Sequence, residues 1–302
     1  MVTGFQPKHL LAATDLSESN VAALRYARLL AERYRTALTV MYSDPIVYPI
    51  GVVGDGVPLV VASTPEHQAR LRLDVEEHVD PILRGVPYEV FVAVGTPATT
   101  IVRAANEKKA DLLVIGTHGH HGWRRALLGS VAESVLHTAS CPVLTVSRHS
   151  SLPAQGPVAI TQVLCPTNFS DVARDSLRVA GALAGEFNAE LIVVHVVEEL
   201  SDQRADAARV RCEVGPQLER LCSYREIVVR GGAAERILDC VDDVGADLLV
   251  VGAQHTLFRD ETVIGSTTER IVRFATCPVL TVTREVAAPS VPDPATELTA
   301  AR

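Results

Sequence analysis

The chain has 302 residues, of which 47% are hydrophobic, and its formal net charge is −8. This length allows two ordinary domains with separate cores, and the acidic balance gives no reason to expect non-specific binding to nucleic acid or to an anionic membrane. Six cysteines without a Cys-x-x-Cys pair argue against a zinc ribbon or a disulfide scaffold. The chain shows no signal-peptide core and no apolar run of about 18 residues, which predicts a cytoplasmic protein without a membrane span.

The first half of the chain alternates between strand and helix patterns. Leu112 to Ile115 is a continuous apolar run, as expected for a strand buried on both faces of a parallel sheet. Apolar residues recur at helical spacing from Val21 to Leu30 and give the first helix one apolar stripe. The alternation predicts a Rossmann-like, doubly wound α/β sheet with right-handed crossovers. The expected strands are 8–14, 37–43, 88–94, 111–116 and 142–147, and the expected helices are 18–34, 65–83, 97–109 and 130–138.

A loop rich in glycine and proline, 44–64, follows the second expected strand. Its composition favours a surface loop whose apolar residues pack against their own domain. A lid over a ligand and a contact with a partner are the alternatives.

The second half of the chain repeats the first. Ala110–Gly116 reappears with one change as Ala246–Gly252, and Cys141–Val146 reappears unchanged as Cys277–Val282. Aligning 110–148 on 246–284 needs no gap and gives 17 identities, at an offset of 136. Nearer the domain starts the offset is 153, so copy two is 17 residues shorter (153 − 136), and the missing part falls near loop 44–64. The sequence therefore predicts two tandem five-stranded domains.

The boundaries follow from composition. Residues 1–148 form the first expected domain and 158–285 the second, joined by a linker at 149–157. The tail, 286–302, contains prolines and little apolar periodicity, so it is expected to be disordered.

Two segments stand where a ligand of such a sheet binds, beyond the carboxyl ends of strands. Asp15 follows the first strand, and the segment Gly116–Gly119 follows the fourth, nine residues before Gly129-Ser130. Glycines would let the backbone turn sharply and approach a ligand. The exposed N–H groups of a helix that starts at Gly129-Ser130 favour an anion such as a phosphate, and Asp15 can accept hydrogen bonds from a ribose.

A purely structural interpretation also exists for the serine. Ser130-x-x-Glu133 fits a capping box, as does Ser266-x-x-Glu269 in copy two. For Ser130 taken alone the two interpretations have equal weight. The capping box does not explain the glycines that surround it.

The spacing Gly116-x2-Gly119-x9-Gly129-Ser130, with Asp15 after the first strand, resembles the ATP-binding pattern of the universal stress protein family. The last strand, 141–146, and the segment 166–170 are similar to the same family. The resemblance covers nearly all of both copies. It implies an adenine nucleotide α-hydrolase-like fold with strand order 3-2-1-4-5, and ATP, with or without Mg²⁺, as the ligand.

The resemblance also implies roles for individual positions. It implies that strands 143–146 and 279–282 pair within the chain as a pseudo-dimer, to which a homodimer or an unidentified protein partner could be added. The implied ligand contacts are Ala13 and Asp15 beside the adenosine, Ser43 at the adenine, Gly116, His118 and Gly119 around the ribose and phosphates, and Gly129, Ser130 and Val131 at the phosphates.

Copy two departs from this pattern at two positions. Asn168 stands where the family has aspartate, and His255 stands where it has the second glycine. Asparagine carries no charge, and histidine cannot take glycine conformations cheaply. We therefore predict weak or absent nucleotide binding in copy two.

The loop of copy one is rich in histidine and arginine. A solvated loop is favoured over a metal site for His118, His120 and His121, because no fourth zinc ligand is evident. Arg124-Arg125 either neutralises phosphate charge or forms a solvated basic turn, and Trp123 is interpreted as a packing residue.

These observations predict an ATP-binding stress-response regulator. No Ser-His-Asp set, P-loop lysine or carboxylate dyad is evident, so fast catalysis is not expected, although slow ATP hydrolysis stays open. The first alternative is an enzyme of the adenine nucleotide hydrolase or ligase group, but Ala13–Ser17 lacks the glycine-rich loop that such enzymes need. The second alternative is an adaptor that binds no nucleotide.

Overall fold

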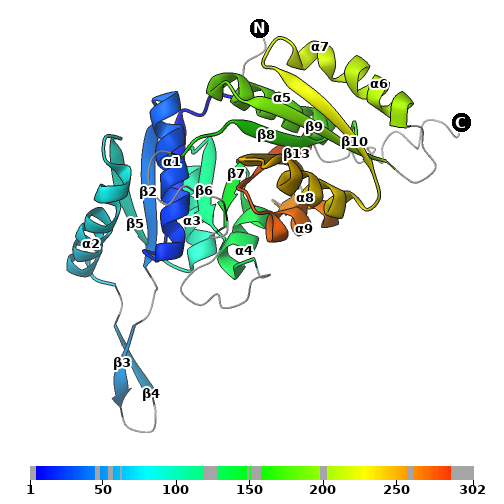
Figure 1. Ribbon diagram of the computed structural model, residues 1–302. Coiled ribbons are helices and arrows are strands. Elements are labelled where there is room, and N and C mark those ends of the chain that lie inside the picture. The colour runs from blue at the N-terminus through cyan, green and yellow to red at the C-terminus, as the bar shows by residue number, and fades with distance from the viewer. Residues whose placement is uncertain are drawn as a thin grey trace, which may run out of the picture.

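One mixed sheet built from both copies forms the centre of the molecule (Figure 1). The computed structural model describes residues 5–44, 48–53, 57–61, 63–117, 128–147, 150, 158–197, 203–256 and 261–286. The main sheet has the order β10-β9-β8-β11-β13-β7-β6-β1-β2-β5, so each half has the predicted order 3-2-1-4-5. The strands of domain 1 are β1 (His9–Thr14), β2 (Ala37–Asp44), β5 (Tyr88–Val94), β6 (Leu112–Gly116) and β7 (Val143–Val146). Those of domain 2 are β8 (Gln162–Pro166), β9 (Glu190–Val197), β10 (Tyr224–Arg230), β11 (Leu248–Thr256) and β13 (Val279–Val286).

Helices cover both faces of this sheet, as the doubly wound prediction requires. Successive residues of β1 point to opposite faces: Leu10 and Ala12 join one core cluster, and Leu11 and Ala13 join the other. The first cluster contains α1 (Val21–Tyr34), α2 (Pro65–Leu83), α5 (Asp171–Phe187), α6 (Gln203–Glu213) and α7 (Gly215–Leu218). The second contains α3 (Pro97–Glu107), α4 (Ser130–Thr138), α8 (Ala233–Val244) and α9 (Ser266–Phe274). Both clusters therefore run through both domains.

Two predicted helix boundaries differ from the structure. The helix expected at 18–34 begins with a 3-10 turn, η1 (Glu18–Asn20), before α1, and the helix expected at 97–109 ends at Glu107. No helix among the described residues is long and apolar enough to cross a bilayer.

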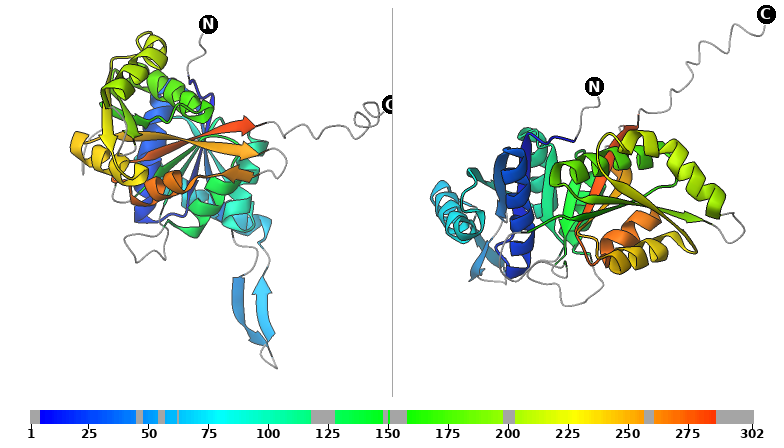
Figure 2. Two further views of the ribbon diagram at one scale, coloured as in Figure 1. Left: turned by 90° about the vertical axis from the view of Figure 1, so that its right-hand side faces the viewer. Right: turned by 45° about the horizontal axis from the view of Figure 1, so that its top comes forward.

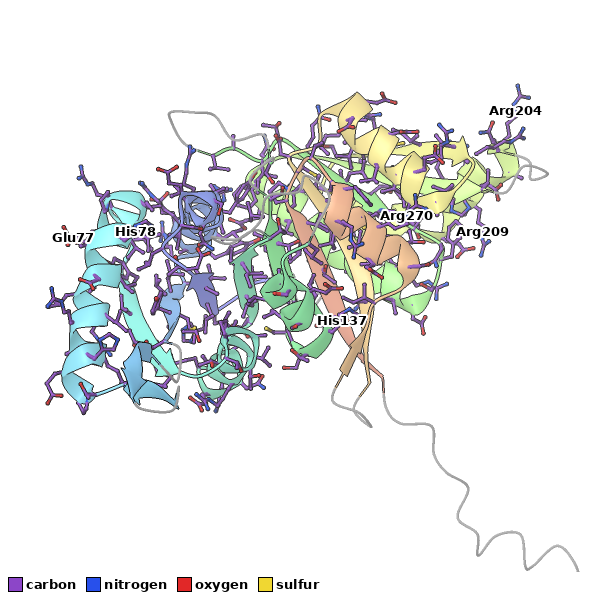
Figure 3. All side chains as sticks on the ribbon, turned by 90° about the horizontal axis from the view of Figure 1, so that it is seen from below. Glu77, His78, His137, Arg204, Arg209 and Arg270 are labelled. Atoms are coloured by element: carbon purple, nitrogen blue, oxygen red, sulfur yellow. The ribbon has the colours of Figure 1, made fainter. Side chains whose placement is uncertain are left out.

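The two domains are joined edge to edge. β7 and β13 pair antiparallel, with Leu144 opposite Leu280 and Thr145 opposite Val279. The Thr145 hydroxyl donates a hydrogen bond of 3.1 Å to the Val279 carbonyl. This pairing confirms the predicted pseudo-dimer. In Figure 3, Glu77 of α2 and Arg204 of α6 lie at opposite ends of the molecule, with His137 of α4 between them.

The segment between β2 and α2 contains a hairpin, where we expected a loop packed on its own domain. β3 (Tyr48–Val53) and β4 (Val57–Val61) form an antiparallel two-stranded sheet that is separate from the main sheet. Figures 1 and 2 show the hairpin projecting away from the body of domain 1. The packing prediction was therefore wrong. The two strands satisfy each other's backbone groups, so the segment does not need the domain surface for that purpose.

The cysteines are unpaired thiols, and three of them, Cys165, Cys240 and Cys277, are buried. Burial raises the pKa of the Cys141 thiol to about 11 and that of Cys277 to about 12. These thiols are therefore protonated near neutral pH and pack as small apolar groups, as predicted for most of the cysteines. Cys141 and Cys222 are half-buried and Cys212 is exposed, so full burial is confirmed for three of the six cysteines.

Candidate functional site

Asp15 is held in a tight turn directly after β1. Leu16 takes a positive φ of 62°, and its N–H donates to the Thr14 hydroxyl at 3.1 Å. The Ser17 N–H and hydroxyl both donate to Oδ1 of Asp15, at 3.0 and 2.6 Å. The turn thus fixes one carboxylate oxygen and holds the Asp15 side chain, which is partly exposed, at the carboxyl end of β1.

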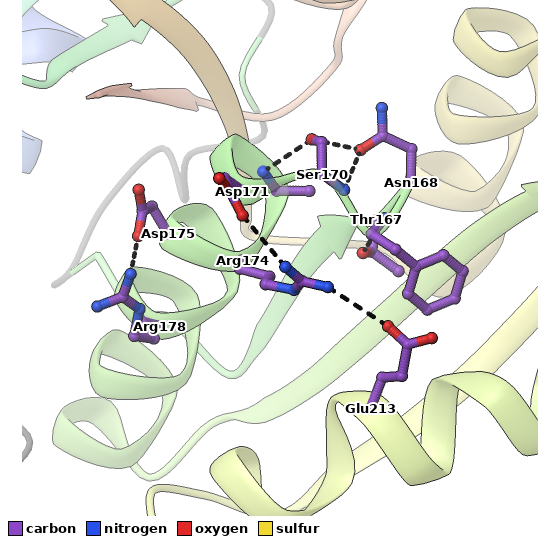
Figure 4. Close-up of polar contacts among 10 residues, drawn as sticks. Thr167, Asn168, Ser170, Asp171, Arg174, Asp175, Arg178 and Glu213 are labelled. Carbon is purple, nitrogen blue, oxygen red and sulfur yellow. Dashed lines mark hydrogen bonds and ion pairs between the residues drawn. The ribbon is translucent and has the colours of Figure 1, made fainter. Parts of the chain in front are cut away.

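Domain 2 builds the same turn from an amide. Phe169 has the same φ of 62°, and the Ser170 N–H and hydroxyl donate to Oδ1 of Asn168 at 3.1 and 2.7 Å (Figure 4). Asparagine therefore satisfies every contact of this turn that aspartate makes with the following serine. Folding of the turn does not require the carboxylate, so the negative charge of Asp15 is the feature that needs a functional reason.

The phosphate-side residues stand at the beginning of α4. Gly129 is the N-cap, Ser130 is the first helical residue, and the Glu133 N–H donates to the Gly129 carbonyl at 2.9 Å. Domain 2 has the same arrangement around the N-cap Gly265 of α9. The capping-box interpretation is therefore wrong in both copies, because the serine lies one position inside the helix. The first N–H groups of α4 lack an intrahelical acceptor, as at every helix start, and favour an anion.

A backbone hydrogen bond closes the loop that leads to α4. The Gly129 N–H donates to the Thr117 carbonyl at 2.7 Å, which places the start of α4 beside the end of β6. Because β6 pairs with β1, this edge of the sheet also carries the Asp15 turn. The two parts of the predicted motif are thus brought to one edge, at the point where the strand order reverses.

The other predicted ligand contacts fall into two groups. Some residues have side chains that are buried or already hydrogen-bonded, and the rest lie outside the residues that the structure describes. Ala13 is 3% exposed and lies in the core, so only its main chain can face a ligand. The Ser43 hydroxyl is tied to the Gly95 carbonyl at 3.0 Å, which also leaves the main chain as the contact. Val131 packs against the core from α4. The residues outside the described ranges are His118, Gly119, His120, His121, Trp123, Arg124 and Arg125.

Packing explains why residue 116 is a glycine, whereas the sequence suggested that the ligand requires a glycine there. A β-carbon on Gly116 would lie 3.0 Å from Nδ2 of Asn20 and 3.8 Å from its Cα. The matching Gly252 of domain 2 is tighter, since a β-carbon there would lie 2.4 Å from Cγ1 and 3.1 Å from the carbonyl oxygen of Val172. These glycines let the helix after the Asp15 or Asn168 turn pack on the fourth strand.

Substitution of Gly252 tests this packing role. We expect Gly252→Ala to lower the free energy of unfolding by about 1–3 kcal/mol, because the new methyl group overlaps Val172. Gly265→Ser is the control: its β-carbon meets no heavy atom within 4 Å, and serine is a preferred N-cap. Urea unfolding of both variants gives the comparison. Equal midpoints would show that α5 moves away from β11 without cost.

Domain 2 replaces the predicted ligand loop with sheet. The β6–β7 ladder ends at Gly116 opposite Val146, whereas the β11–β13 ladder continues to Thr256 opposite Val286. β12 (Glu261–Val263) pairs antiparallel with the far side of the same stretch. His255 therefore lies in a strand flanked by strands on both sides. Ala253 is part of β11, whereas the matching Thr117 lies beyond the end of β6. β12 also contacts α4 of domain 1.

Two buried polar residues of domain 1 were not predicted from the sequence. Asn20 is 5% exposed, and its Oδ1 has no hydrogen-bond partner among the described residues. Asp44, at the end of β2, is fully buried, and Nε2 of His67 lies 3.6 Å from its Oδ1. Copy two has Ala173 and Val197 at these positions. A comparison of the two copies for polar residues unique to copy one would have found both.

Besides burial, the carboxylates of Asp15 and Asp44 both raise the pKa of the Tyr42 phenol. Burial raises the pKa of Tyr42, and the carboxylates of Asp44, Asp15 and Asp74 raise it further. Negative charge therefore gathers at the ends of β1 and β2, while N–H donors gather at the start of α4. Such a site suits a molecule with amino or hydroxyl groups at one end and an anion at the other.

The fold and the candidate site together define a class: a tandem, doubly wound α/β protein with a candidate ligand site at the switch point of the sheet. The model of the universal stress protein family matches twice, over residues 7–147 and 159–283. The chain belongs to the universal stress protein family, in a tandem two-domain form.

Individual relatives agree with this assignment. The chain is 31% identical over 141 residues to universal stress protein MJ0531 of Methanocaldococcus jannaschii, which covers 47% of this chain and 82% of that protein. It is 29% identical over 201 residues to universal stress protein Rv2005c of Mycobacterium tuberculosis, covering 61% and 65%. The crystal structure of a universal stress protein from Archaeoglobus fulgidus superposes with a TM-score of 0.69 at 22% identity, over 93% of this chain and all of that one.

Proposed function

We propose that the protein is a stress-response regulator that binds ATP in domain 1, with domain 2 in a structural or regulatory role. The difference between the copies at matching positions carries the proposal. Domain 1 has a carboxylate at Asp15 and a strand that stops at Gly116, whereas domain 2 has an amide at Asn168 and a strand that continues to Thr256. Only domain 1 combines an acceptor for ribose hydroxyls with an interrupted strand ahead of the anion-binding helix start.

The residues of domain 1 fit an adenine nucleotide. Asp15 would accept hydrogen bonds from the ribose, the main chain at Ala13 and Ser43 would face the base, and the start of α4 at Ser130 would hold the phosphates. His118 and Gly119 complete the proposed contacts. Mg²⁺ would bind with the phosphates and neutralise part of their charge. Among the described residues, no group of three metal-ligating side chains could hold a metal ion.

We propose a binding role for this site, without fast catalysis. The Ser17 hydroxyl, which donates to Asp15, belongs to a residue that is only 7% exposed, and it holds the turn after β1, so we do not assign it the role of a nucleophile. Slow ATP hydrolysis is the alternative enzymatic role, and a turnover assay distinguishes it. A nucleotide-free adaptor is the third role, and a binding assay distinguishes that one.

Further self-association needs a surface other than the last strands, because β7 and β13 already pair with each other inside the chain. We propose that any homodimer or protein partner uses another feature, and the projecting β3–β4 hairpin is the part of domain 1 that extends farthest from the sheet (Figure 2). Light scattering of the protein with and without residues 46–62 measures this contribution.

The proposed function predicts a nucleotide stoichiometry. Protein purified without added nucleotide and then denatured should release about one adenine nucleotide per chain, because we assign the nucleotide site to domain 1 alone. Chromatography of the supernatant identifies and counts the nucleotide. Two nucleotides per chain would refute the assignment of domain 2. No released nucleotide, together with no binding on titration, would favour the adaptor.

A further inference from the structure

The start of α4 in domain 1 is supported by residues of domain 2. Leu128, directly before the N-cap Gly129, is 8% exposed and belongs to the second core cluster. β12 of domain 2 contacts α4, and Ile264, which follows β12, packs against the same core cluster. The helix start that is proposed to hold phosphates is therefore packed by both domains.

α4 meets its counterpart α9 at the junction of the two domains (Figures 1 and 3). Leu128 and Leu136 line one narrow gap together with Ile264 and Val272. Both pairs are separated by the repeat offset of 136 (264 − 128 and 272 − 136). Each residue thus shares the gap with its own counterpart from the other copy, as in the interface of a two-fold symmetric dimer.

The packing around this gap is close. The gap is too small to hold a water molecule. Close-packed apolar side chains have low compressibility and transmit strain, so a shift on one side displaces the other. Movement of Ile264 in domain 2 is therefore transmitted to Leu128, one residue before the N-cap of α4.

The support in domain 2 is attached to the central sheet. β12 pairs with β11 at Thr262 opposite His255, and β11 pairs on its other side with β13 at Glu285 opposite His255. In domain 1 the start of α4 is tied to the end of β6 by the bond from the Gly129 N–H to the Thr117 carbonyl. The stretch of domain 2 that departs from the nucleotide-binding pattern at His255 thus forms part of the packing behind the candidate site of domain 1.

We propose that β12 and Ile264 of domain 2 position the start of α4 and so set the affinity of domain 1 for the phosphates of its nucleotide. This inference rests on the proposed function and gives domain 2 a defined part in it. Ile264 is a positioning residue, because it acts through Leu128 and not through a contact with the ligand. The proposed contacts with ribose and base come from β1 and β2, so the support acts on the phosphate part of the site.

Ile264→Ala opens the gap beside Leu128 and tests the support without any ligand. In the nucleotide-free chain, we expect the amides at the start of α4 to exchange hydrogen at least about threefold faster, because the helix start opens locally more often. The Glu133 N–H, which donates to the Gly129 carbonyl at 2.9 Å, reports this change. Ile264→Leu should exchange like the wild-type chain, since copy one has leucine at the matching position 128.

Calorimetric titration of the full chain then measures the effect on the ligand. Ile264→Ala should weaken ATP binding about tenfold, whereas adenosine, which lacks the phosphates, should bind within about twofold of the wild-type value. Coupling between two sites is reciprocal. ATP should therefore slow hydrogen exchange across residues 254–264 in the wild-type chain and not in Ile264→Ala.

Leu177→Ala separates positioning from a general loss of stability. Leu177 of α5 is 3% exposed and lies in the first core cluster, on the other face of the sheet, so its truncation destabilises domain 2 away from the gap. It should leave ATP affinity within about twofold of the wild-type value. Equal weakening of ATP by Leu177→Ala and Ile264→Ala would overturn the inference. Equal weakening of ATP and adenosine by Ile264→Ala, or unchanged exchange at the start of α4, would also overturn it. A wild-type chain that binds no ATP would refute the proposed function instead, and the exchange of the nucleotide-free chain would still show whether Ile264 holds α4.

Discussion

Replacing Asp15 with alanine is expected to weaken ATP binding about 100-fold, because the carboxylate is proposed to accept charge-assisted hydrogen bonds from the ligand, each worth about 1.5–3 kcal/mol. The same change also removes the acceptor that holds Ser17 in the turn after β1. Alanine alone therefore cannot separate loss of the charge from loss of the turn. Calorimetry of the purified variant gives the change in affinity.

Asp15→Asn separates loss of the charge from loss of the turn, because domain 2 already forms this turn with an asparagine. Asn168 forms the corresponding turn in domain 2 with bonds of 3.1 and 2.7 Å to Ser170, so asparagine at position 15 should keep the turn. It exchanges the second carboxylate oxygen for an amide donor. We expect Asp15→Asn to weaken ATP binding at least about tenfold with an unchanged urea midpoint.

The matched control for both variants is Asn168→Ala, which removes the corresponding side chain in domain 2. It should leave the ATP affinity within about twofold of the wild-type value, because Asn168 lies in domain 2 and does not contact the proposed ATP site. If Asn168→Ala and Asp15→Ala reduced ATP binding equally, the ATP site could not be assigned to domain 1. Stoichiometric ATP binding by the Asp15→Ala chain would exclude the carboxylate as a ligand contact.

The architecture was predictable because the repeat and the apolar runs are strong, redundant signals. Leu112–Ile115 and its counterpart Leu248–Val251 were predicted as central strands, and both lie fully covered by helices in the structure. The pairing of 143–146 with 279–282 came from the family resemblance and is confirmed. Hydrophobic periodicity reports which residues face a core, so it locates elements well.

The site was less predictable because it depends on non-local geometry. A one-residue difference in the start of α4 decides whether Ser130 caps the helix or lies inside it, and sequence patterns do not resolve one residue. The packing reason for Gly116 depends on Asn20, which is distant in sequence. The extension of β11 depends on pairing with β12 and β13, which the divergent loop sequence did not reveal.

The junction between the domains should contribute a large share of the stability of the whole chain. Leu144 and Leu280 lie opposite each other across β7 and β13, and each is 2% exposed in the same core cluster. Because that cluster continues through both domains, each substitution to alanine should lower the free energy of unfolding by about 2–4 kcal/mol. Leu73→Ala, at a side chain that is 64% exposed, should change it by less than about 0.5 kcal/mol.

The double variant decides whether the junction is a shared core. Residues in direct contact show coupling energies of about 0.5–3 kcal/mol, so Leu144→Ala with Leu280→Ala should cost measurably less or more than the sum of the single changes.

Urea unfolding of the wild-type chain, followed by fluorescence and circular dichroism, should show one transition, since both core clusters cross β7 and β13. Two separate transitions with strictly additive costs would mean that the domains fold independently and that the β7–β13 pair is a surface contact. A single coupled transition would mean instead that ligand binding in either domain stabilises the other, which is the physical basis for a regulatory role of domain 2.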